Sequence, residues 1–284
     1  MEYKKLNNGL EMPILGLGTY QVRDPQECIN QVKLALKHGY RLIDTAQGYE
    51  NEAYIGKAIK ESNVDRKEIF LTTKINFINY ETETCIASIE QSLKNLQTDY
   101  LDLVLLHWPF GNYYAAYRVL EDYYHRGIIK AIGVSNFWAN QLSDLIHYNN
   151  VVPVINQLET HLYGQQSAIQ PILEKYAVVQ EAYAPLGQNR ANDMFNEEAV
   201  QTLVKKYHKT PAQIALRYLT QKGVVVIPKS VHEERIIENI SIFDFRLTDE
   251  EMASLQALDK NLIMIGNSQS IDRVESSFHW YDKK

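Results

Sequence analysis

Short apolar segments typical of strands alternate along the chain with longer segments that have the spacing of amphipathic helices. Eight strand segments follow one another in this way, each with at least one helix after it, and no low-complexity linker interrupts them. Parallel strands joined by helices build α/β proteins, and eight such units favour a (β/α)8 TIM barrel. We expect the strands at Leu15–Tyr20, Arg41–Asp44, Ile69–Lys74, Leu101–His107, Ile128–Val134, Val151–Asn156, Val178–Tyr183 and Val224–Ile227.

Further elements are expected at both ends of a single domain that spans residues 1–284. Tyr3–Ile14 predicts an N-terminal β-hairpin, because an Asn-Gly pair within it supplies the positive φ of a tight turn. Extra helices are expected at Glu233–Asn239 and Asp249–Leu258. The C-terminal tail, Asn261–Lys284, is rich in aromatic residues but lacks clear periodicity, so it is either a free end or a flap over the barrel mouth. The helices between the strands are expected at Pro25–His38, Asn51–Glu61, Thr82–Leu96, Ala115–Arg126, Asn140–Tyr148, Ala168–Tyr176, Glu197–His208 and Pro211–Gln221.

The composition restricts the partners that such a protein binds. A net charge of −6 suggests neither nucleic acid nor an anionic membrane, although a local basic pocket would still accept a small anion. Two cysteines, Cys28 and Cys85, give no disulfide framework. The N-terminus has no apolar secretory core. No apolar run approaches the ~20 residues of a membrane span. We therefore expect a soluble, cytoplasmic protein.

Polar side chains follow three neighbouring strands at the point where each strand ends. Asp44, Lys74 and His107 end the second, third and fourth strands, and Tyr49 lies in the segment after Asp44. Strand ends of this kind share the rim on which TIM barrels carry their active sites. A lysine cation beside a tyrosine lowers the pKa of the phenol, and an aspartate keeps that lysine charged. The four residues therefore predict a tuned proton donor.

Each of these residues also has an ordinary structural explanation. Asp44 alone would most often be a helix cap or a loop hydrogen-bond acceptor, Tyr49 a packed ring among 19 tyrosines, and His107 a core histidine. The glycines of Leu15–Tyr20 lack the G-x-G-x-x-G spacing of a dinucleotide fingerprint, which argues against a Rossmann fold. The occurrence of all four polar residues at adjacent strand ends is what favours catalysis.

Several longer segments of the chain resemble the aldo-keto reductase family. They occur in the family's order from the hairpin to the last barrel helix, so the resemblance covers nearly the whole chain. The group it resembles within the family includes bacterial diketogluconate reductases and small-aldehyde reductases. The segments are Gly39–Ala46 with Tyr49 and Asn51–Glu52, Thr72–Lys74, Leu106–Pro109, Gly133–Phe137, Asn156–Gln157 with Glu159, Ala182–Gly187, and Ile227–Ser230 with Arg235 and Glu238–Asn239.

The resemblance implies an NADPH-dependent oxidoreductase that reduces an aldehyde or ketone to the alcohol by hydride transfer. Tyr49 would protonate the carbonyl oxygen, Lys74 and Asp44 would tune it, and His107 would orient the substrate. An unperturbed tyrosine, with a pKa of ~10, is a slow acid, so such tuning has a clear purpose. The expected substrate pocket comprises Tyr20, Tyr49, Phe77, His107 and Trp108, with Phe278 and Trp280 of the tail as further candidates.

The same resemblance implies how the rim would bind NADPH. Ser135, Asn136 and Gln157 would hold the nicotinamide carboxamide, and Tyr183 would stack on the ring. At the other end, a basic group would bind the 2′-phosphate, and Glu238 would have to turn away from that phosphate toward the adenine. The expected cofactor-binding residues are Gly18, Thr19, Tyr20, Asp44, Ser135, Asn136, Gln157, Tyr183, Ala184, Leu186, Lys229, Ser230, Val231, Arg235, Glu238 and Asn239.

Two other functions remain open at this stage. Lys74 could form a Schiff base with a carbonyl substrate, as in an aldolase. The chain could also bind NADPH mainly to report redox state to a partner protein, although no extension or exposed apolar helix is evident for such a partner. For the reductase, we expect a small-molecule carbonyl substrate, no metal, and a monomer or weak dimer.

Overall fold

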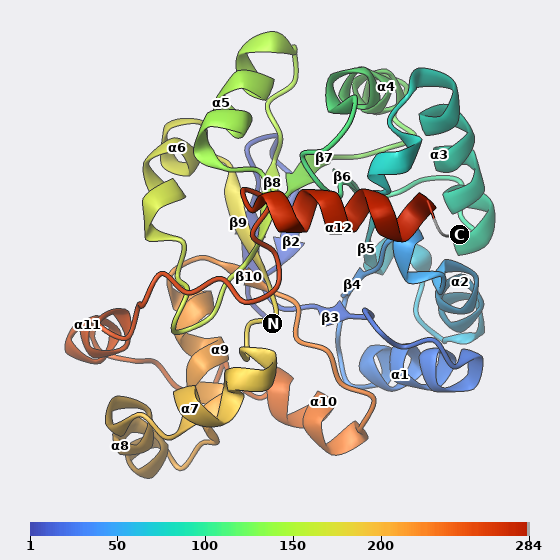
Figure 1. Ribbon diagram of the computed structural model, residues 1–284. Coiled ribbons are helices and arrows are strands. Elements are labelled where there is room, and N and C mark those ends of the chain that lie inside the picture. The colour runs from blue at the N-terminus through green and yellow to red at the C-terminus, as the bar shows by residue number, and fades with distance from the viewer. Residues whose placement is uncertain (283–284) are drawn as a thin grey trace.

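The computed structural model describes residues 1–282, with side chains described as far as His279 (Figure 1). Eight strands pair in sequence order, each parallel to the next, as the alternating pattern predicted. A separate antiparallel hairpin precedes them and consists of β1 (Tyr3–Lys5) and β2 (Glu11–Pro13). The parallel strands are β3 (Leu17–Gly18), β4 (Leu42–Asp44), β5 (Phe70–Ile75), β6 (Leu103–Leu106), β7 (Ile132–Ser135), β8 (Ile155–Glu159), β9 (Val179–Tyr183) and β10 (Val225–Val226).

The sheet closes into a barrel through the residues that surround β3. Leu15 forms a parallel bridge with Val226 of β10. The Gly16 amide donates to the Val226 carbonyl at 2.8 Å, and the Gly18 amide donates to the Pro228 carbonyl at 3.1 Å. The first and last strands of the series are therefore joined, which gives the expected (β/α)8 topology and places the carboxyl ends of all eight strands around one mouth.

Helices surround this barrel, and their ends follow capping rules that are visible in the sequence. The Asp24 side chain accepts a hydrogen bond from the Glu27 amide at 2.8 Å, with Pro25 at the first helical position. Thr210 and Gln213 form a capping box at another helix. The α-helices are α1 (Pro25–Lys37), α2 (Glu52–Glu61), α3 (Thr82–Leu96), α4 (Tyr113–His125), α5 (Ala139–Tyr148), α6 (Gln170–Lys175), α7 (Ala191–Phe195), α8 (Glu198–Tyr207), α9 (Pro211–Gln221), α10 (Glu233–Ile240), α11 (Asp249–Gln256) and α12 (Ile271–Asp282).

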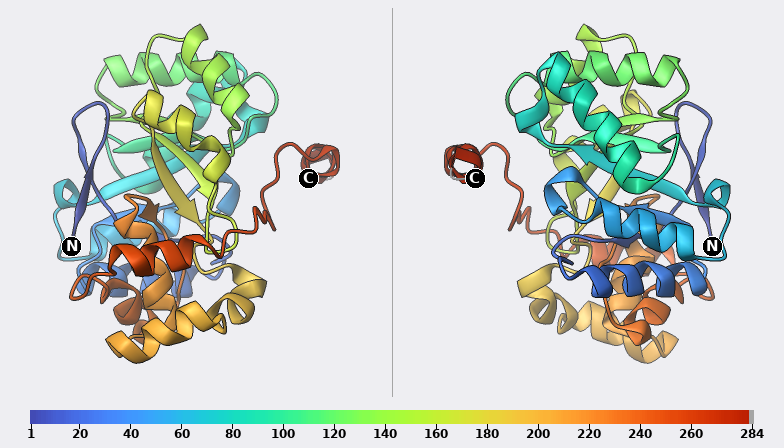
Figure 2. Two further views of the ribbon diagram at one scale, coloured as in Figure 1. Left: turned by 90° about the vertical axis from the view of Figure 1, so that its left-hand side faces the viewer. Right: turned by 90° about the vertical axis from the view of Figure 1, so that its right-hand side faces the viewer.

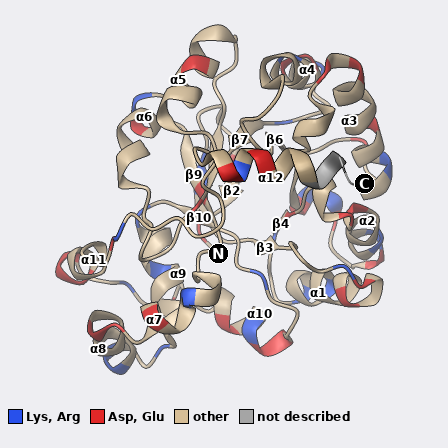
Figure 3. Ribbon diagram, in the orientation of Figure 1, with Lys and Arg blue, Asp and Glu red and all other residues tan. Residues whose placement is uncertain are grey.

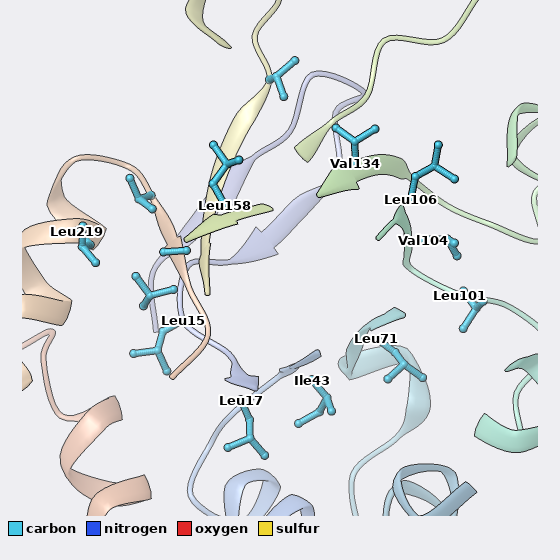
Figure 4. Packing of buried hydrophobic residues seen from close by; sticks show 14 of the residues in the cluster. Leu15, Leu17, Ile43, Leu71, Leu101, Val104, Leu106, Val134, Leu158 and Leu219 are labelled. Atoms are coloured by element: carbon cyan, nitrogen blue, oxygen red, sulfur yellow. The ribbon is translucent and has the colours of Figure 1, made fainter. Parts of the chain in front are cut away.

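Buried apolar side chains form two layers, one outside and one inside the barrel. The outer layer lies between strands and helices and includes Ile43, Leu71 and Val104 (Figure 4). The inner layer fills the barrel, and Leu6 and Met12 of the hairpin region belong to it. The hairpin therefore plugs the end of the barrel opposite the mouth. Each fully buried aliphatic side chain contributes about 1.5–3 kcal/mol relative to an exposed one, so this packing fixes the rim.

Of the two alternatives for the C-terminal tail, the structure has the flap over the barrel mouth, and much of this flap is helical. After an irregular segment that starts at Asn261, α12 lies across the barrel mouth, at the end opposite the hairpin (Figures 1 and 2). The Phe278 ring lies 5.0 Å from the Phe77 ring, and Val274 packs against the outer apolar layer. The side chain of Trp280, a pocket candidate, lies outside the described residues.

Charged side chains lie mainly on the outer helices and are scarce on the strands (Figure 3). Among residues 1–282, no helix combines the length and the apolar character needed to cross a membrane. The short helix α7 was also not expected from the sequence. It follows β9 near the mouth and contacts α8.

Candidate active site

The four rim residues predicted from the sequence meet at the mouth of the barrel. Asp44 is the last residue of β4, Lys74 lies near the end of β5, and His107 directly follows β6. Tyr49 ends a short 3-10 turn after β4, in which its amide donates to the Ala46 carbonyl at 3.0 Å. The parallel register brings these strand ends to one level, so side chains far apart in the sequence face one another.

Lys74 lies at the centre of this group and is fully buried. Its Nζ donates to Asp44 Oδ1 at 2.5 Å, to the Thr45 carbonyl at 3.0 Å and to Tyr49 Oη at 3.3 Å. The Tyr49 ring is in turn 5.0 Å from the Tyr20 ring and 5.7 Å from the His107 ring, measured between centroids. All three ammonium hydrogens have acceptors, so the amine is held under the phenol in one orientation.

The charges of this group follow from burial and from its partners. Burial disfavours the Lys74 ammonium, but attraction to Asp44 and to the Tyr49 oxygen outweighs it and raises the pKa of Lys74. Burial raises the pKa of Asp44, while the Lys74 charge and the hydrogen bonds from Lys74 and Gln157 oppose that shift. A charged, fully bonded amine is a poor nucleophile, which argues against the Schiff-base alternative.

The pKa of Tyr49 corrects one sequence-based expectation. Lys74 lowers it, as predicted, but burial of the phenol is the larger effect and raises the pKa of Tyr49 to about 12. The phenolate would lose its hydration in this pocket, and one lysine does not replace it fully. Tyr49 therefore holds its proton firmly at neutral pH, in the state that a proton donor needs before the reaction.

His107 is neutral, which suits it to donate a hydrogen bond. Burial, followed by the cationic charges of Lys74 and Arg273, holds its pKa well below the ordinary value. Its backbone is fixed on both sides, because its amide donates to the Ile75 carbonyl at 3.1 Å and its carbonyl accepts from Asn136 Nδ2 at 3.1 Å. No described residue hydrogen-bonds its ring nitrogens, so the imidazole presents a nitrogen to the cavity.

Glu181 of β9 belongs to the same network, and sequence reasoning missed it. Gln157 Nε2 donates to Asp44 Oδ2 and to Glu181 Oε2, both at 2.9 Å. Glu181 is fully buried, and its Oε1 has no partner among the described residues. Burial, followed by repulsion from Asp44, raises the pKa of Glu181 to about 8. A carboxyl group in the middle of a short strand of the barrel, β9, was the available signal.

The raised pKa of Glu181 predicts a pH-dependent stability. The pKa of Glu181 is about 8 in the folded chain, against an ordinary value of 4.5. Between these pH values the folded chain binds one proton more than the unfolded chain. The free energy of unfolding therefore falls as pH rises from about 4.5 to about 8. One proton contributes at most about 1.4 kcal/mol per pH unit. We expect Glu181→Gln to remove this slope from the free energy of unfolding measured by urea denaturation between about pH 5 and 8. Glu83→Gln is an exposed control. If the free energy of unfolding changed with pH in the same way in Glu181→Gln, in Glu83→Gln and in the wild type, Glu181 would not be the group with the raised pKa.

The rim surrounds one large cavity of about 710 Å³, a size suited to a small-molecule site. Most of the residues predicted for substrate and cofactor line it, whereas Lys74 lies beneath its floor. The predicted residues in its wall are Gly18, Thr19, Tyr20, Asp44, Tyr49, Phe77, His107, Trp108, Ser135, Asn136, Gln157, Tyr183, Ala184, Leu186 and Lys229. Residues that were not predicted there include Arg23, Gln188, Asn189, Ile265, Arg273, Ser276 and Ser277.

The remaining predicted cofactor residues lie beyond this cavity. Val231 and Arg235 line a second, open hollow at the start of α10, and Arg235 is exposed without an ion pair to any described residue. Ser230, which directly precedes Val231, is buried, and so is Asn239 of α10. Glu238 accepts a hydrogen bond from Thr210 Oγ1 at 2.6 Å. This bond directs the carboxylate toward the start of α9, where it helps to cap that helix.

The groups at the deep end of the cavity fit the carboxamide of a nicotinamide ring. Gln157 spends both Nε2 hydrogens on Asp44 and Glu181, which leaves its Oε1 to accept from a ligand. Ser135 Oγ and Asn136 lie beside it, joined by a 3.1 Å hydrogen bond. Asn136 has φ of 64°, a left-handed conformation that asparagine adopts more readily than most residues. The Ser135 hydroxyl and the Asn136 amide donate to acceptors within the chain, so Gln157 Oε1 is the acceptor left for the NH2 of a primary carboxamide.

The tail is fastened over this end of the cavity by one carboxylate. Glu159, at the end of β8, accepts from the amides of Met264 and Ile265 at 2.7 Å and of Gly266 at 3.0 Å. Burial acts to raise the pKa of Glu159. The hydrogen bonds from His161 and from these amides outweigh burial, so the pKa of Glu159 lies below its ordinary value. A Cβ at Gly266 would lie 1.8 Å from Tyr183 Oη, so only glycine allows this approach. The strand end thus positions the segment that leads into α12.

The comparison with known proteins identifies the class of this chain. The model of the Aldo/keto reductase family matches residues 14–260. The chain therefore belongs to the aldo/keto reductase family, and it is an oxidoreductase of aldehydes or ketones. The family assignment agrees with the barrel, with the buried lysine under a tyrosine, and with the resemblance found in the sequence.

Three relatives cover most of the chain. A glyoxal reductase from Bacillus subtilis is 43% identical over 258 residues, 90% of this chain and 92% of the relative. The crystal structure of MGS-M4, an aldo-keto reductase from a Medee basin deep-sea metagenome library, has a TM-score of 0.92 and 42% identity over 94% of this chain and 99% of that one. The aldo-keto reductase AKR2E5, complexed with NADPH, has a TM-score of 0.87 and 34% identity over 92% of this chain and 89% of that one.

Proposed function

We propose that this enzyme uses NADPH to reduce small aldehydes or ketones, with Tyr49 as the proton donor. The observation that carries the proposal is the contact of Lys74 with both Asp44 and Tyr49 beneath a cavity that a neutral His107 also lines. When bound, NADPH would supply the hydride for the carbonyl carbon. The relative complexed with NADPH supports this choice of cofactor.

The side chains have distinct tasks in this proposal. His107 donates a hydrogen bond to the carbonyl oxygen and orients it, which a neutral imidazole does without giving up its proton. Tyr49 donates its proton to the same oxygen as negative charge develops there. Lys74 stabilises the phenolate that remains, and Asp44 keeps Lys74 charged and fixed. The proton thus moves from a donor that is held in place before the substrate arrives.

The cavity wall favours a small carbonyl compound. Tyr20, Phe77 and Trp108 give it an aromatic lining near Tyr49, and α12 narrows its mouth. The glyoxal reductase from Bacillus subtilis supports a small dicarbonyl as the substrate. The test is a screen of NADPH oxidation with small aldehydes, dicarbonyls, keto sugars and aromatic aldehydes. Trapping of a substrate on Lys74 by borohydride, without NADPH oxidation, would favour the aldolase alternative.

Cofactor choice depends on Arg235 and Lys229 in this proposal. Both side chains are exposed cations near the start of α10, and Arg235 has no carboxylate partner among the described residues. An arginine binds a phosphate with a planar fork of donors, and hydrogen bonds to charged groups contribute ~1.5–3 kcal/mol. We expect Arg235→Ala to weaken NADPH binding by roughly ten- to a hundred-fold.

NADH provides the internal control for that experiment, because it has no 2′-phosphate. We expect Arg235→Ala to leave the Kd of NADH nearly unchanged, with both Kd values measured by quenching of protein fluorescence. The preference for NADPH should also decrease as salt rises, since the contact is exposed. Equal losses for the two cofactors would mean that Arg235 maintains the shape of the site and does not bind the phosphate.

We also propose that the enzyme works as one domain and as a monomer or weak dimer in the cytoplasm. All of the rim residues come from a single barrel, so no second copy is needed to complete the site. Both cysteines are buried and unpaired, which suits a reducing compartment. Gel filtration together with light scattering of the purified chain would test the oligomeric state.

A further inference from the structure

Helix α12 brings a guanidinium group into the wall of the active-site cavity. Arg273 lines that cavity together with Ser276 and Ser277, which lie one turn further along α12. The guanidinium carbon of Arg273 is 4.4 Å from the centroid of the Trp108 ring. This cation–π contact fixes the side chain against the residue that directly follows His107. Arg273 therefore lies beside Trp108, in the part of the cavity where we expect the substrate.

This cation has no anionic partner within the described part of the chain. Arg273 Nε is buried and has no hydrogen-bond partner there, and no ion pair links Arg273 to Asp272 or Glu275, its neighbours on α12. Buried donors are normally satisfied, because an unpaired one costs free energy. Its charge nevertheless reaches the reaction site. It adds to the lowering of the His107 pKa by burial and Lys74, and it partly opposes the rise in the Tyr183 pKa that burial and Glu159 cause.

The charges around the cavity favour an anionic ligand at this point. The lining contains the cations Arg23, Lys229 and Arg273 but one carboxylate, Asp44. Lys74 already neutralises Asp44 through their 2.5 Å ion pair. Arg273 stacks on Trp108, the residue that directly follows His107, which places this cation beside the part of the cavity that His107 lines. A guanidinium is a suitable donor to a carboxylate or a phosphate. The Ser276 and Ser277 hydroxyls donate to the Arg273 carbonyl, so the guanidinium is the group that would bind the anion.

We propose that Arg273 selects carbonyl substrates that carry an anionic group, a carboxylate or a phosphate, at the end remote from the reacting carbonyl. The inference rests on the reductase function proposed above and defines its substrate class. The anion would pair with the guanidinium while the carbonyl oxygen lies between Tyr49 and His107. Neutral aldehydes would still react but would lack this interaction.

The test compares substrates that differ only in charge. 4-Oxobutanoate and its methyl ester form one pair, and glyceraldehyde 3-phosphate and glyceraldehyde form the other. We expect the wild type to have the higher kcat/KM for the anionic member of at least one pair. In Arg273→Gln, the ratio of anionic to neutral kcat/KM for that pair should fall by about ten- to a hundred-fold. The pair with the larger change identifies carboxylate or phosphate as the recognised group.

Two further variants separate charge recognition from a structural role. Arg273→Lys keeps the charge and should retain part of the ratio, whereas Lys205→Gln removes an exposed cation of α8 and should leave the ratio unaltered. The wild-type ratio should also fall as salt rises. Equal losses for both members of a pair in Arg273→Gln, or no preference in the wild type, would overturn the proposal while leaving the reductase function intact. A wild type that reduces none of the compounds with NADPH would overturn both.

Discussion

Tyr49→Phe is expected to lower kcat for aldehyde reduction by ~10²–10⁴-fold, the usual contribution of a general acid. The substitution removes one hydroxyl group and leaves the ring between Tyr20 and His107, where it contacts both. The Lys74 ammonium loses its 3.3 Å contact with the phenol but keeps Asp44 and the Thr45 carbonyl. The fold and the binding of NADPH should therefore persist while proton donation is lost.

Single-turnover kinetics should carry this measurement, because product release limits many enzymes. Tyr54→Phe on α2 is a matched control, since it removes a phenol hydroxyl away from the cavity. NADPH affinity and the thermal unfolding midpoint of Tyr49→Phe should stay close to those of the wild type. A hydride-transfer rate for Tyr49→Phe within a few-fold of the wild type would exclude Tyr49 as the donor.

The strand ends account for what the sequence predicts well. Asp44, Lys74 and His107 each follow a short apolar run, and in a parallel barrel neighbouring strand ends always share one rim. Their proximity therefore follows from local pattern and topology together. The proximity of Ser135 to Gln157 is predictable for the same reason, because β7 and β8 are adjacent strands.

Other features depend on packing that no local pattern reveals. Glu181 points toward Gln157 because β9 pairs with both β8 and β10, and this pairing fixes which side of the sheet each side chain occupies. The pKa of Tyr49 has the predicted contribution from Lys74, but its burial depends on the whole mouth of the barrel. Arg273 reaches the cavity because Glu159 fastens the preceding segment through three backbone amides. Each of these depends on contacts between distant parts of the chain.

Lys74→Met is expected to destabilise the fold as well as to impair catalysis. The substitution leaves the Asp44 carboxylate buried, with the hydrogen bond from Gln157 but without its cation. Removing one partner of a buried ion pair typically costs about 3–5 kcal/mol in the free energy of unfolding. The double variant Lys74→Met/Asp44→Asn removes both charges and should regain most of that stability, because no unpaired charge remains in the barrel.

Catalysis should not recover with stability in that double variant. Lys74 stabilises the Tyr49 phenolate, so its removal disfavours the charged form and must raise the pKa of Tyr49 still further. In alcohol oxidation, where Tyr49 accepts a proton, the apparent pKa of the rate should therefore move to higher pH in both variants. Asp44→Asn alone should shift it less, because the lysine remains, although held less firmly, and because the Asp44 charge that raises the pKa of Tyr49 is removed. Urea denaturation and pH–rate profiles of the three variants separate the two effects. If the double variant regained wild-type turnover with its stability, Lys74 would be a structural partner of Asp44 that does not tune the tyrosine.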